Sequence, residues 1–398
     1  MKTIAFAIEN FSRFGGGAES YLVDLAEFFI QSGWQVHVYA ERTDHPLPSA
    51  IVHPIPLPRH APNWVRSLLF ALRHRRLVRQ ANHDVVYGVG NTLEMDVYQS
   101  HGGVHWLSTL RKVYTEPTPV RRVVKRVLVA LSLKNHVRHW IESAPFRHRP
   151  RPVVIAISEM IRRDMGRWHG IDPAGIELVY NGIDLGRFDP ERQGQWRDEV
   201  RARSGIAGDE TVFVFVSYEL KKKGILPLVR AAARLRERRA RFRVLVVGGE
   251  PDAGLVHEVE RLGLAGTVLF TGPTRQVAAM YAAADAFVLP TYYDACSLAV
   301  LEAMACGLPA ITTETNGIAG LLSPGTDGFV ISHPPNEAEL ASVMEGLLDA
   351  EFRHQVGTAA RAKAGRCTKR ANHEAILALC ERAALSHKKI DTPEGLGV

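Results

Sequence analysis

The sequence is poor in cysteine and has no long apolar run. The four cysteines show no metal-ligand spacing and are too few for a disulfide framework, so a reducing compartment is predicted. No stretch approaches the roughly 18 uninterrupted apolar residues of a membrane-spanning helix. The opening residues, MKTIAFAIENF, lack the long apolar core of a signal peptide. We therefore expect a cytoplasmic protein that is soluble or peripheral to a membrane.

Acidic residues are scarce in two segments. Residues 59–79 contain six arginines and no acid, and residues 111–151 contain eleven lysines and arginines against Glu116 and Glu142. Such segments indicate an anionic partner, namely a membrane surface, an anionic glycolipid or nucleic acid, although a merely solvated basic face is the alternative. Nucleic acid is disfavoured because the aromatic residues form no stacking platform. Helices predicted at 64–80 and 121–140 could lie in a membrane interface or pack against a core.

The remaining pattern alternates apolar strands with helices, which is typical of parallel α/β domains. A chain of 398 residues is long enough for two such domains. We place the first at 1–175 and the second at 176–368, with a final segment, 369–398, that ends in a frayed tail.

The segment 287–313 carries the strongest signal. It predicts a strand at 287–289, a helix at 298–305 with Ser297 as N-cap, and a strand at 310–313. Glu302 is the one polar residue between Leu298 and Cys306, and Asp294 precedes the helix. Two carboxylates beside the amides at Ser297 and Leu298 suit a sugar nucleotide, with one accepting from sugar hydroxyls and the other from ribose. Alternatively, Glu302 pairs with a buried arginine and Asp294 is a solvated loop acid.

Two further loops follow predicted strands. Lys221, Lys222 and Lys223 stand before a helix, where they could bind a diphosphate or form only a solvated charge run. Residues 15–17 are glycines between strand 2–8 and helix 18–32, so the backbone there could approach a ligand or serve as a flexible turn.

Two histidines, His101 and His105, flank Gly102 and Gly103 after the strand predicted at 84–89. A neutral imidazole can accept or donate a proton near physiological pH, so both are candidates for a polar role in a cleft. The alternative for each is a structural histidine.

The acid-x7-acid spacing followed by EAMACGLPAITT resembles the signature of retaining glycosyltransferases of family 4, and NGID at 181–184 also matches. The stretch DVYQSHGGVH looks like its counterpart in the lipopolysaccharide core glucosyltransferases of that family. The resemblance implies the GT-B fold, which has two Rossmann-like, doubly wound domains facing across a cleft. It also implies that the last helices cross back to the first domain.

Individual residues carry over from the resemblance. Gly16, Gly17 and Glu19 match a loop that approaches the donor phosphates and the acceptor. Lys223 matches the family's phosphate-binding lysine. The position of the family's arginine holds Tyr218, so Lys222 is expected to share the work. The first family acid is usually Glu, and here it is Asp294.

The hypothesis is a retaining, metal-independent hexosyltransferase that needs no cofactor, since lysines replace a cation and no DxD motif lies near the phosphate elements. UDP-glucose is the expected donor and the lipopolysaccharide core, or a similar anionic glycolipid, the expected acceptor. The enzyme would work at the inner face of the plasma membrane. His101, His105 and Asp294 are the candidate catalytic residues, and Glu302 should hold the ribose. A sugar-nucleotide epimerase of the same fold, or a transferase using GDP-mannose or UDP-N-acetylglucosamine, is the alternative.

Overall fold

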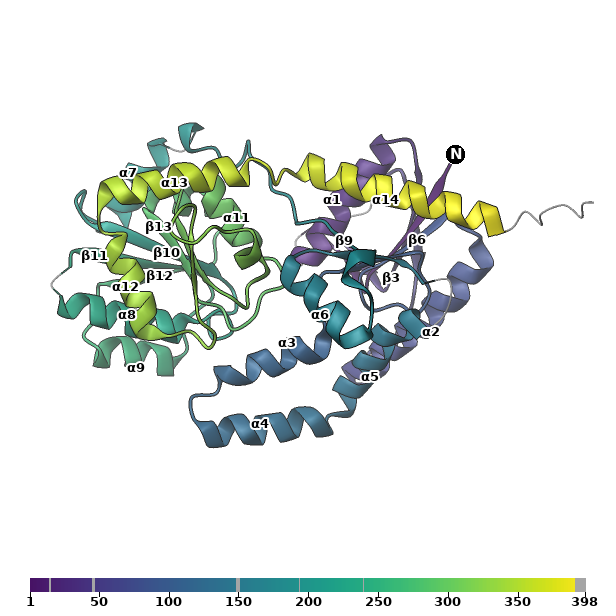
Figure 1. The fold of residues 1–398 in the computed structure, drawn as a ribbon, viewed down its shortest axis with the longest axis horizontal. Helices are drawn as coiled ribbons and strands as arrows, with labels where there is room; N and C mark the ends of the chain where they lie inside the picture. Colours follow the sequence, from purple (N-terminus) through teal and green to yellow (C-terminus); the bar gives the residue numbers. More distant parts are fainter. Residues whose placement is uncertain (14–15, 45–46, 148–150, 193, 239, 391–398) are drawn as a thin grey trace, which may run out of the picture. The chain divides into compact units, whose positions relative to one another are not determined.

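The computed structural model describes residues 1–13, 16–44, 47–147, 151–192, 194–238 and 240–390. The chain forms two compact units (Figure 1). Unit 1 comprises residues 1–110, 123–180 and the chain from Arg370 onward, and unit 2 comprises Arg111–Arg122 and Asn181–Lys369.

Unit 1 is built on a seven-stranded parallel sheet, which confirms the expected α/β class. In spatial order its strands are β5 (Ala50–Pro54), β3 (Gln35–Ala40), β1 (Thr3–Ala7), β6 (Val85–Gly88), β7 (Val97–Ser100), β8 (Val153–Ala156) and β9 (Ile176–Leu178). The chain runs from β1 outward to β5 and then returns to β6 on the other side of β1. Strand order therefore reverses between β1 and β6, a point where α/β sheets bind ligands.

Helices cover both faces of this sheet. The helices of unit 1 include α1 (Gly17–Gln31), α2 (Asn63–Ala81), α5 (Leu133–Ser143), α6 (Glu159–His169) and α14 (Lys369–Ile390), and the short α3 (His105–Arg111) leads from unit 1 into the segment 111–122. The strands and α1 share an aromatic core, in which the rings of Phe6 and Phe29 meet edge to face 5.6 Å apart. Helix α14 joins this core through Ile376 and Cys380. Helix α14 thus packs as part of unit 1.

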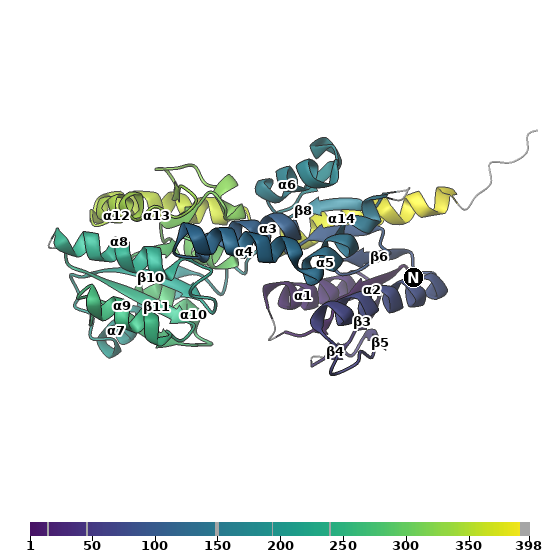
Figure 2. The same ribbon diagram turned by 90° about the horizontal axis from the view of Figure 1, so that it is seen from below.

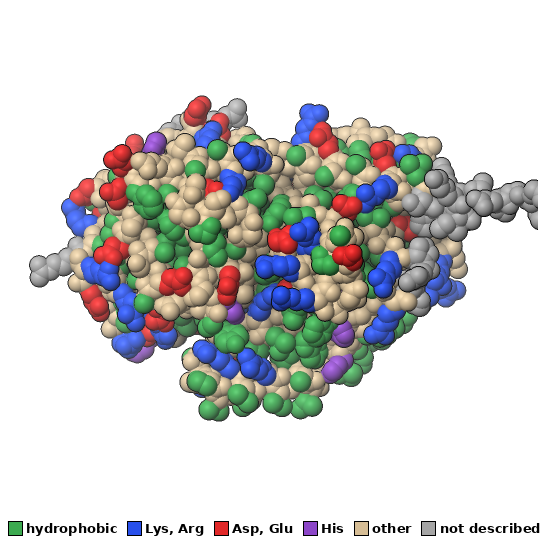
Figure 3. Space-filling view, in the orientation of Figure 1, with side chains coloured by type: hydrophobic (Ala, Val, Ile, Leu, Met, Phe, Trp, Pro, Cys, Tyr) green, Lys and Arg blue, Asp and Glu red, His purple; other side chains and the backbone are tan. Residues whose placement is uncertain are grey.

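The helix predicted at 121–140 is two helices, because the chain breaks at Ser132 between α4 (Pro119–Leu131) and α5. Helix α4 has no buried residue. In Figure 3, hydrophobic side chains in green crowd the lower edge, where Figure 1 places α4, with lysine and arginine side chains in blue above them. The helix predicted at 64–80 is confirmed as α2, but its buried face contains Phe70, Ala71 and His74 and leaves Leu72 exposed.

Unit 2 is built on a six-stranded parallel sheet. Its order is β12 (Val268–Gly272), β11 (Phe242–Gly248), β10 (Thr211–Ser217), β13 (Ala286–Leu289), β14 (Ala310–Thr313) and β15 (Phe329–Ile331). Strand order reverses between β10 and β13. The first five residues of β10 are buried and apolar or β-branched, as expected of a central parallel strand.

The helices of unit 2 form a layer on each face of its sheet (Figure 1). They are α7 (Gly194–Arg203), α8 (Ile225–Glu237), α9 (Ala253–Arg261), α10 (Val277–Ala283), α11 (Leu298–Ala305), α12 (Glu337–Gly346) and α13 (Ala350–Ala364). Helices α8 and α12 lie side by side in both ribbon views (Figure 1 and Figure 2). The predicted strand, helix, strand unit at 287–313 is confirmed as β13, α11 and β14.

Among the described residues, no helix is both long enough and apolar enough to cross a bilayer.

Candidate functional site

Three loops of unit 2 meet where strand order reverses. They follow β10, β13 and β14, whose carboxyl ends lie together because β13 pairs with both neighbours. The amide of Tyr292 donates to the carbonyl of Lys222 at 3.1 Å, which joins the first two loops. The amide of Asp294 donates to Thr315 at 3.1 Å, and Gly317 donates back to Asp294 at 2.8 Å. The lysine loop and the first predicted acid are therefore held at one edge of the sheet.

Gly224 fixes how closely the lysine loop packs on β13. Its φ is +85°, in the left-handed region, and a Cβ atom there would lie 1.9 Å from the carbonyl oxygen of Pro290. A side chain at this position would therefore clash with backbone that cannot move aside. The close approach seats the three lysines at the strand end.

Lys223 and Asp294, predicted separately as phosphate and sugar ligands, form an ion pair. The ammonium lies 2.5 Å from Oδ2 of Asp294, and the two side chains are 19% and 18% exposed. The other carboxylate oxygen accepts from the amide of Cys296 at 3.3 Å. Lys222 instead pairs with Glu219, and its side chain is half exposed. The structure thus brings together Lys223 and Asp294 and leaves Lys222 at the rim.

The start of α11 is organised differently from the prediction. Ser297 is the N-cap residue, as predicted, but its side chain makes no capping hydrogen bond. Its amide instead donates to Oδ1 of the fully buried Asn316 at 3.4 Å. The loop after β14 thereby holds the turn, and Leu298 begins the helix with no acid in the first turn.

Glu302 projects from α11 toward Tyr281 on α10. The tyrosine hydroxyl donates to Oε2 at 3.0 Å. Burial raises the pKa of the Glu302 carboxyl, while this hydrogen bond and the positive charges of Arg187 and Lys369 lower it. The hydrogen-bond partner of Glu302 is therefore a neutral tyrosine hydroxyl and not the buried arginine of the alternative prediction. The hydroxyl donates to only one of the two carboxylate oxygens.

Lys112 is a charged residue of this region that sequence reasoning assigned only to a basic segment. It opens a short 3-10 helix, η1 (Lys112–Thr115), within the part of the chain that clusters with unit 2. Its ammonium lies 5.2 Å from the ring centroid of Tyr293, and the guanidinium of Arg111 lies 5.6 Å from the same ring. Burial lowers the pKa of Lys112, and the charges of Lys222 and Lys223 lower it further.

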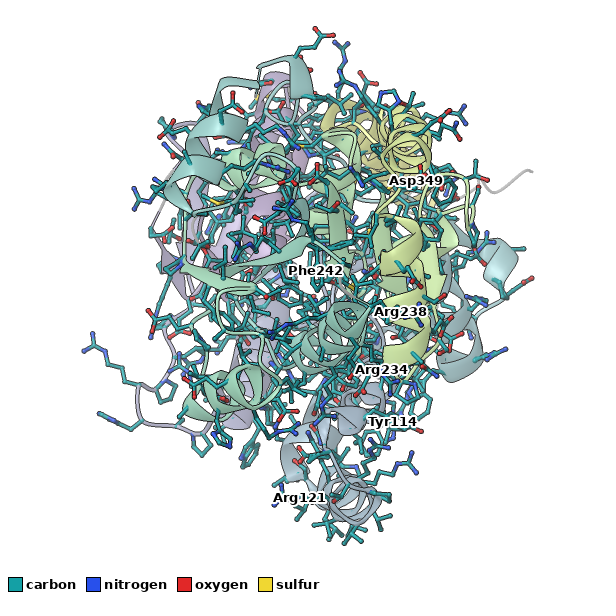
Figure 4. The ribbon with its side chains drawn as sticks, turned by 90° about the vertical axis from the view of Figure 1, so that its left-hand side faces the viewer. Tyr114, Arg121, Arg234, Arg238, Phe242 and Asp349 are labelled. Atoms are coloured by element: carbon teal, nitrogen blue, oxygen red, sulfur yellow. The ribbon has the colours of Figure 1, made fainter. Side chains whose placement is uncertain are left out.

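Tyr114 anchors this segment on unit 2. Its ring meets the ring of His333 edge to face at 5.1 Å, and Nδ1 of His333 lies 3.2 Å from the hydroxyl of Thr315. Tyr114 and Arg121 mark the segment in Figure 4. The contact places Lys112 beside the loop that carries Tyr293 and Asp294. The ammonium groups of Lys112, Lys222 and Lys223 are therefore close enough to influence one another.

Asn181, the first residue of NGID, also reaches this turn. Its Nδ2 donates to the carbonyl of Cys296 at 3.4 Å. The side chain is 6% exposed, and Oδ1 has no hydrogen-bond partner within the described residues. An unpaired buried carbonyl is costly, which makes this oxygen a candidate acceptor for a ligand hydroxyl.

The glycine loop belongs to unit 1. Gly16 is the N-cap of α1 and has an extended backbone, and Gly17 begins the helix; both are exposed. The Glu19 side chain folds back over Gly16, because a Cβ there would lie 2.7 Å from Oε2 of Glu19. The helix start is thus covered by a carboxylate rather than a capping hydroxyl. Gly15 lies outside the described residues.

The two histidines, also in unit 1, differ in their surroundings. One ring nitrogen of His101 lies 2.7 Å from Oε1 of Gln99, and burial lowers its pKa to about 4. His105 begins α3; its Nε2 lies 3.1 Å from Oδ1 of Asn135, and its amide donates to Glu142 at 2.9 Å. His105 therefore ties α3 to α5, whereas His101 is a neutral imidazole next to Tyr21.

Within the described residues, no group of three or more His, Cys, Asp or Glu side chains is placed to hold a metal ion. Positive charge in this region comes from lysine and arginine.

Comparisons with known proteins cover both halves of the chain. A model described as Glycosyltransferase Family 4 matches residues 15–187, and one described as Glycosyl transferases group 1 matches residues 197–363. The chain is 29% identical over 385 residues to D-inositol 3-phosphate glycosyltransferase 2 of Catenulispora acidiphila, covering 85% of this chain and 83% of that protein.

Solved structures share the fold. WaaG, a glycosyltransferase involved in lipopolysaccharide biosynthesis, superposes with a TM-score of 0.76 at 23% identity, covering 96% of this chain and 98% of its own. HepE of Anabaena, in complex with UDP and glucose, superposes with a TM-score of 0.65 at 19% identity, covering 98% of this chain and 100% of its own. The GT-B class predicted from the sequence is thus confirmed.

Proposed function

Since the chain belongs to glycosyltransferase family 4 and is a retaining glycosyltransferase, we propose that it transfers a hexose, glucose from UDP-glucose, to an anionic glycolipid such as the lipopolysaccharide core. One observation carries the donor half of this proposal. Lys223 pairs with Asp294 and Lys112 lies over the neighbouring Tyr293 at the head of α11, where strand order reverses, while Lys222 lies at the rim. Such a cluster suits a diphosphate, because ammonium groups and helix amides both favour an anion.

Departure of the diphosphate is the step that these groups would assist. Positive charge that is already in place where negative charge develops lowers the barrier without reorganisation. Lys223 would exchange its bond to Asp294 for one to phosphate, which frees Asp294 to accept from the sugar hydroxyls. Lys112 would supply the second partly buried charge that the family takes from an arginine, since Tyr218 at that position is 73% exposed.

Glu302 would bind the ribose of the donor. Tyr281 holds one carboxylate oxygen, and the other can accept from ribose hydroxyls. Hydrogen bonds to the ionised form would offset the effect of burial on its pKa. The free Oδ1 of Asn181 offers a further acceptor near the same turn.

The groups of unit 1 would serve the acceptor and the donor phosphates. We propose that Gly16, Gly17 and Glu19 approach the phosphates and that His101, neutral at pH 7, accepts a hydrogen bond from a reacting hydroxyl. His105 would act by positioning α3. Attack by the acceptor on the same face as the leaving group accounts for retention without a second enzymic carboxylate.

Helix α4 supports an acceptor carried by a membrane. Val124, Leu128 and Leu131 are 52%, 63% and 76% exposed, and arginines and lysines alternate with them along the helix. An amphipathic helix of this kind lies in the interface of an anionic membrane, with its apolar face toward the acyl chains. We therefore propose peripheral association with the inner face of the plasma membrane.

A soluble phosphorylated polyol is the second candidate acceptor. It is favoured by the relatives named D-inositol 3-phosphate glycosyltransferases, which align with most of the chain. An epimerase is set aside, because both family models are of glycosyltransferases.

The test is a panel of labelled sugar nucleotides incubated with the protein alone, with core glycolipid in vesicles and with inositol 3-phosphate. We expect UDP-glucose to be consumed only when an acceptor is present, giving an α-linked product. Transfer to the glycolipid supports the first candidate, and transfer to inositol 3-phosphate supports the second. Conversion of the donor without an acceptor, or no turnover with any pair, contradicts the proposal.

A further inference from the structure

Unit 1 contains a polar cavity that none of the roles above uses. Its volume is about 440 Å³, and it lies at the carboxyl ends of β1 and β3, next to the start of α2. Five cationic side chains line it, those of Arg42, Arg59, Arg66, Lys134 and Arg138. Two carboxylates, those of Glu9 and Glu41, also line it, so the wall carries a net positive charge of three.

Much of the negative charge is already engaged. Glu41 forms an ion pair with Arg66, and Glu9 accepts from the hydroxyl of Ser67 at 3.0 Å. Arg59, Lys134 and Arg138, by contrast, form no ion pair in the part of the chain that the structure describes. The cavity therefore holds cations that no internal acid neutralises, which is the arrangement that binds an anion.

The backbone favours the same ligand. Helix α2 has 19 residues, and its N-cap is Pro62, whose side chain cannot cap the first amides. No acid lies in its first turn, and Asn63 and Trp64 of that turn line the cavity. Free amides at a helix start add to the attraction of an anion, and they do so beside Arg59.

Trp64 and Glu9 add features that an inorganic anion would not need. The partly buried indole of Trp64 offers an apolar face for the C–H side of a sugar or cyclic polyol ring. The carboxylate of Glu9 can accept from ring hydroxyls while it keeps its bond to Ser67. The wall thus combines phosphate donors, a stacking surface and a hydroxyl acceptor within one cavity.

We propose that this cavity binds a phosphorylated sugar or cyclic polyol, with Arg59, Arg138 and the first amides of α2 on the phosphate and Trp64 against the ring. This inference rests on the proposed function, because it assigns the phosphorylated part of an anionic acceptor to unit 1. The same chemistry is offered by a free sugar phosphate and by a lipid headgroup.

The first arm of the test uses soluble probes. Glucose 6-phosphate, glucose and inorganic phosphate are titrated into the full chain by calorimetry at low salt. The double variant Arg59→Gln/Arg138→Gln is compared with Arg76→Gln/Arg163→Gln, which removes the same charge from exposed positions outside the cavity. We expect glucose 6-phosphate to bind more tightly than either fragment and the cavity variant to weaken it by about tenfold or more, since charge-assisted hydrogen bonds to phosphate are lost.

The second arm uses vesicles and separates the two sources. Vesicles containing phosphatidylinositol are compared with vesicles of equal charge containing phosphatidylglycerol. A preference for phosphatidylinositol that only the cavity variant loses assigns the cavity to a lipid headgroup, and binding of the soluble probe without that preference assigns it to a free phosphate. Neither kind of binding, or equal losses in both double variants, overturns the proposal.

UDP binding, measured on the same variants, keeps the two proposals distinguishable. The cavity variant should bind UDP like the wild type, because none of the residues proposed to bind the donor, in either unit, lines the cavity. If UDP fails to bind any variant while glucose 6-phosphate binds as expected, the proposed function fails and the cavity assignment stands.

Discussion

Helices α4 and α11 are both rich in valine and leucine, yet they occupy opposite environments. In α11, Val300 and Leu301 are completely buried, whereas in α4 Leu128 is 63% exposed. Helix α11 connects two adjacent central strands, so neighbouring layers cover it. Helix α4 carries Arg121, Arg122, Lys125 and Arg126 between its apolar residues, and these side chains keep one face in water.

The difference shows that apolar content indicates what a helix must cover but not which partner covers it. In α11 the buried apolar residues hold in place the amides and carboxylates of the proposed donor site. In α4 the same residue types remain available for an external apolar phase. Replacing one leucine in each helix by the same polar residue tests this directly.

The largest effect is expected for Leu301→Gln, compared with Leu128→Gln. At the buried position, lost apolar burial and an unsatisfied amide should lower the free energy of unfolding by about 3–5 kcal/mol. At the exposed position the change should stay within about 0.5 kcal/mol. Urea unfolding followed by circular dichroism measures both.

The same pair of variants sharpens the assignment of α4. Leu128→Gln should lower partition onto anionic vesicles by about tenfold or more, because a leucine buried in the interface contributes about 1.5–3 kcal/mol. Partition is measured by sedimentation with the vesicles. An unchanged value would show that α4 does not bind the membrane. A loss of stability equal to that of Leu301→Gln would show that α4 is packed in solution.

The next effect concerns the region that α11 positions. Lys223→Ala should lower kcat by about 10²–10³-fold, since it removes a charge aimed at the developing diphosphate. Lys221→Ala, in the same loop but exposed, is the matched control and should remain within about twofold of wild type. Steady-state assays with UDP-glucose measure both. Equal activity of the two variants would remove Lys223 from the site.

How far the sequence could predict this region depends on whether the signal is local. The unit β13, α11 and β14 was predictable because apolar runs are bounded by local stop signals, and Gly307 indeed has a left-handed φ of +76°. Lys223 and Asp294 were each placed at a strand end, and adjacent parallel strands bring such ends together. Their ion pair follows from that topology.

Three features could not be predicted because their partners are distant in sequence. Asn316, rather than the Ser297 side chain, organises the start of α11, and this depends on how the loop after β14 packs. The break at Ser132 has no glycine or proline to mark it. Lys112 is brought to Tyr293 by the contact of Tyr114 with His333, which no local pattern encodes.

Lys112 is therefore the sharper test of the cation cluster. Lys112→Ala should weaken UDP binding by about tenfold, less than Lys223→Ala affects turnover, because a cation at the side of the ligand contributes about 1.4 kcal/mol or somewhat more. Lys112→Arg should retain most of the affinity, and Arg121→Ala serves as control for the segment's charge. Calorimetry measures the affinity of each variant for UDP. Wild-type affinity in Lys112→Ala would show that Lys112 only packs on Tyr293 and does not bind the donor.

The smallest effect is expected for Glu302→Gln, and it has opposite signs in two measurements. The amide keeps the bond from Tyr281 but loses the charge that ribose hydroxyls favour, so UDP should bind about threefold more weakly. Burial raises the pKa of Glu302, so the folded protein takes up its proton at a higher pH than the unfolded chain does. The stability contributed by this group is therefore complete at low pH and is lost as the pH rises through the folded pKa. Glu302→Gln should consequently be more stable than wild type at neutral pH, and the difference in stability should disappear as the pH falls.

Urea unfolding across that pH range measures the change in stability, and calorimetry with UDP measures the change in affinity. A carboxylate kept only for structure would instead give a less stable variant with unchanged UDP affinity.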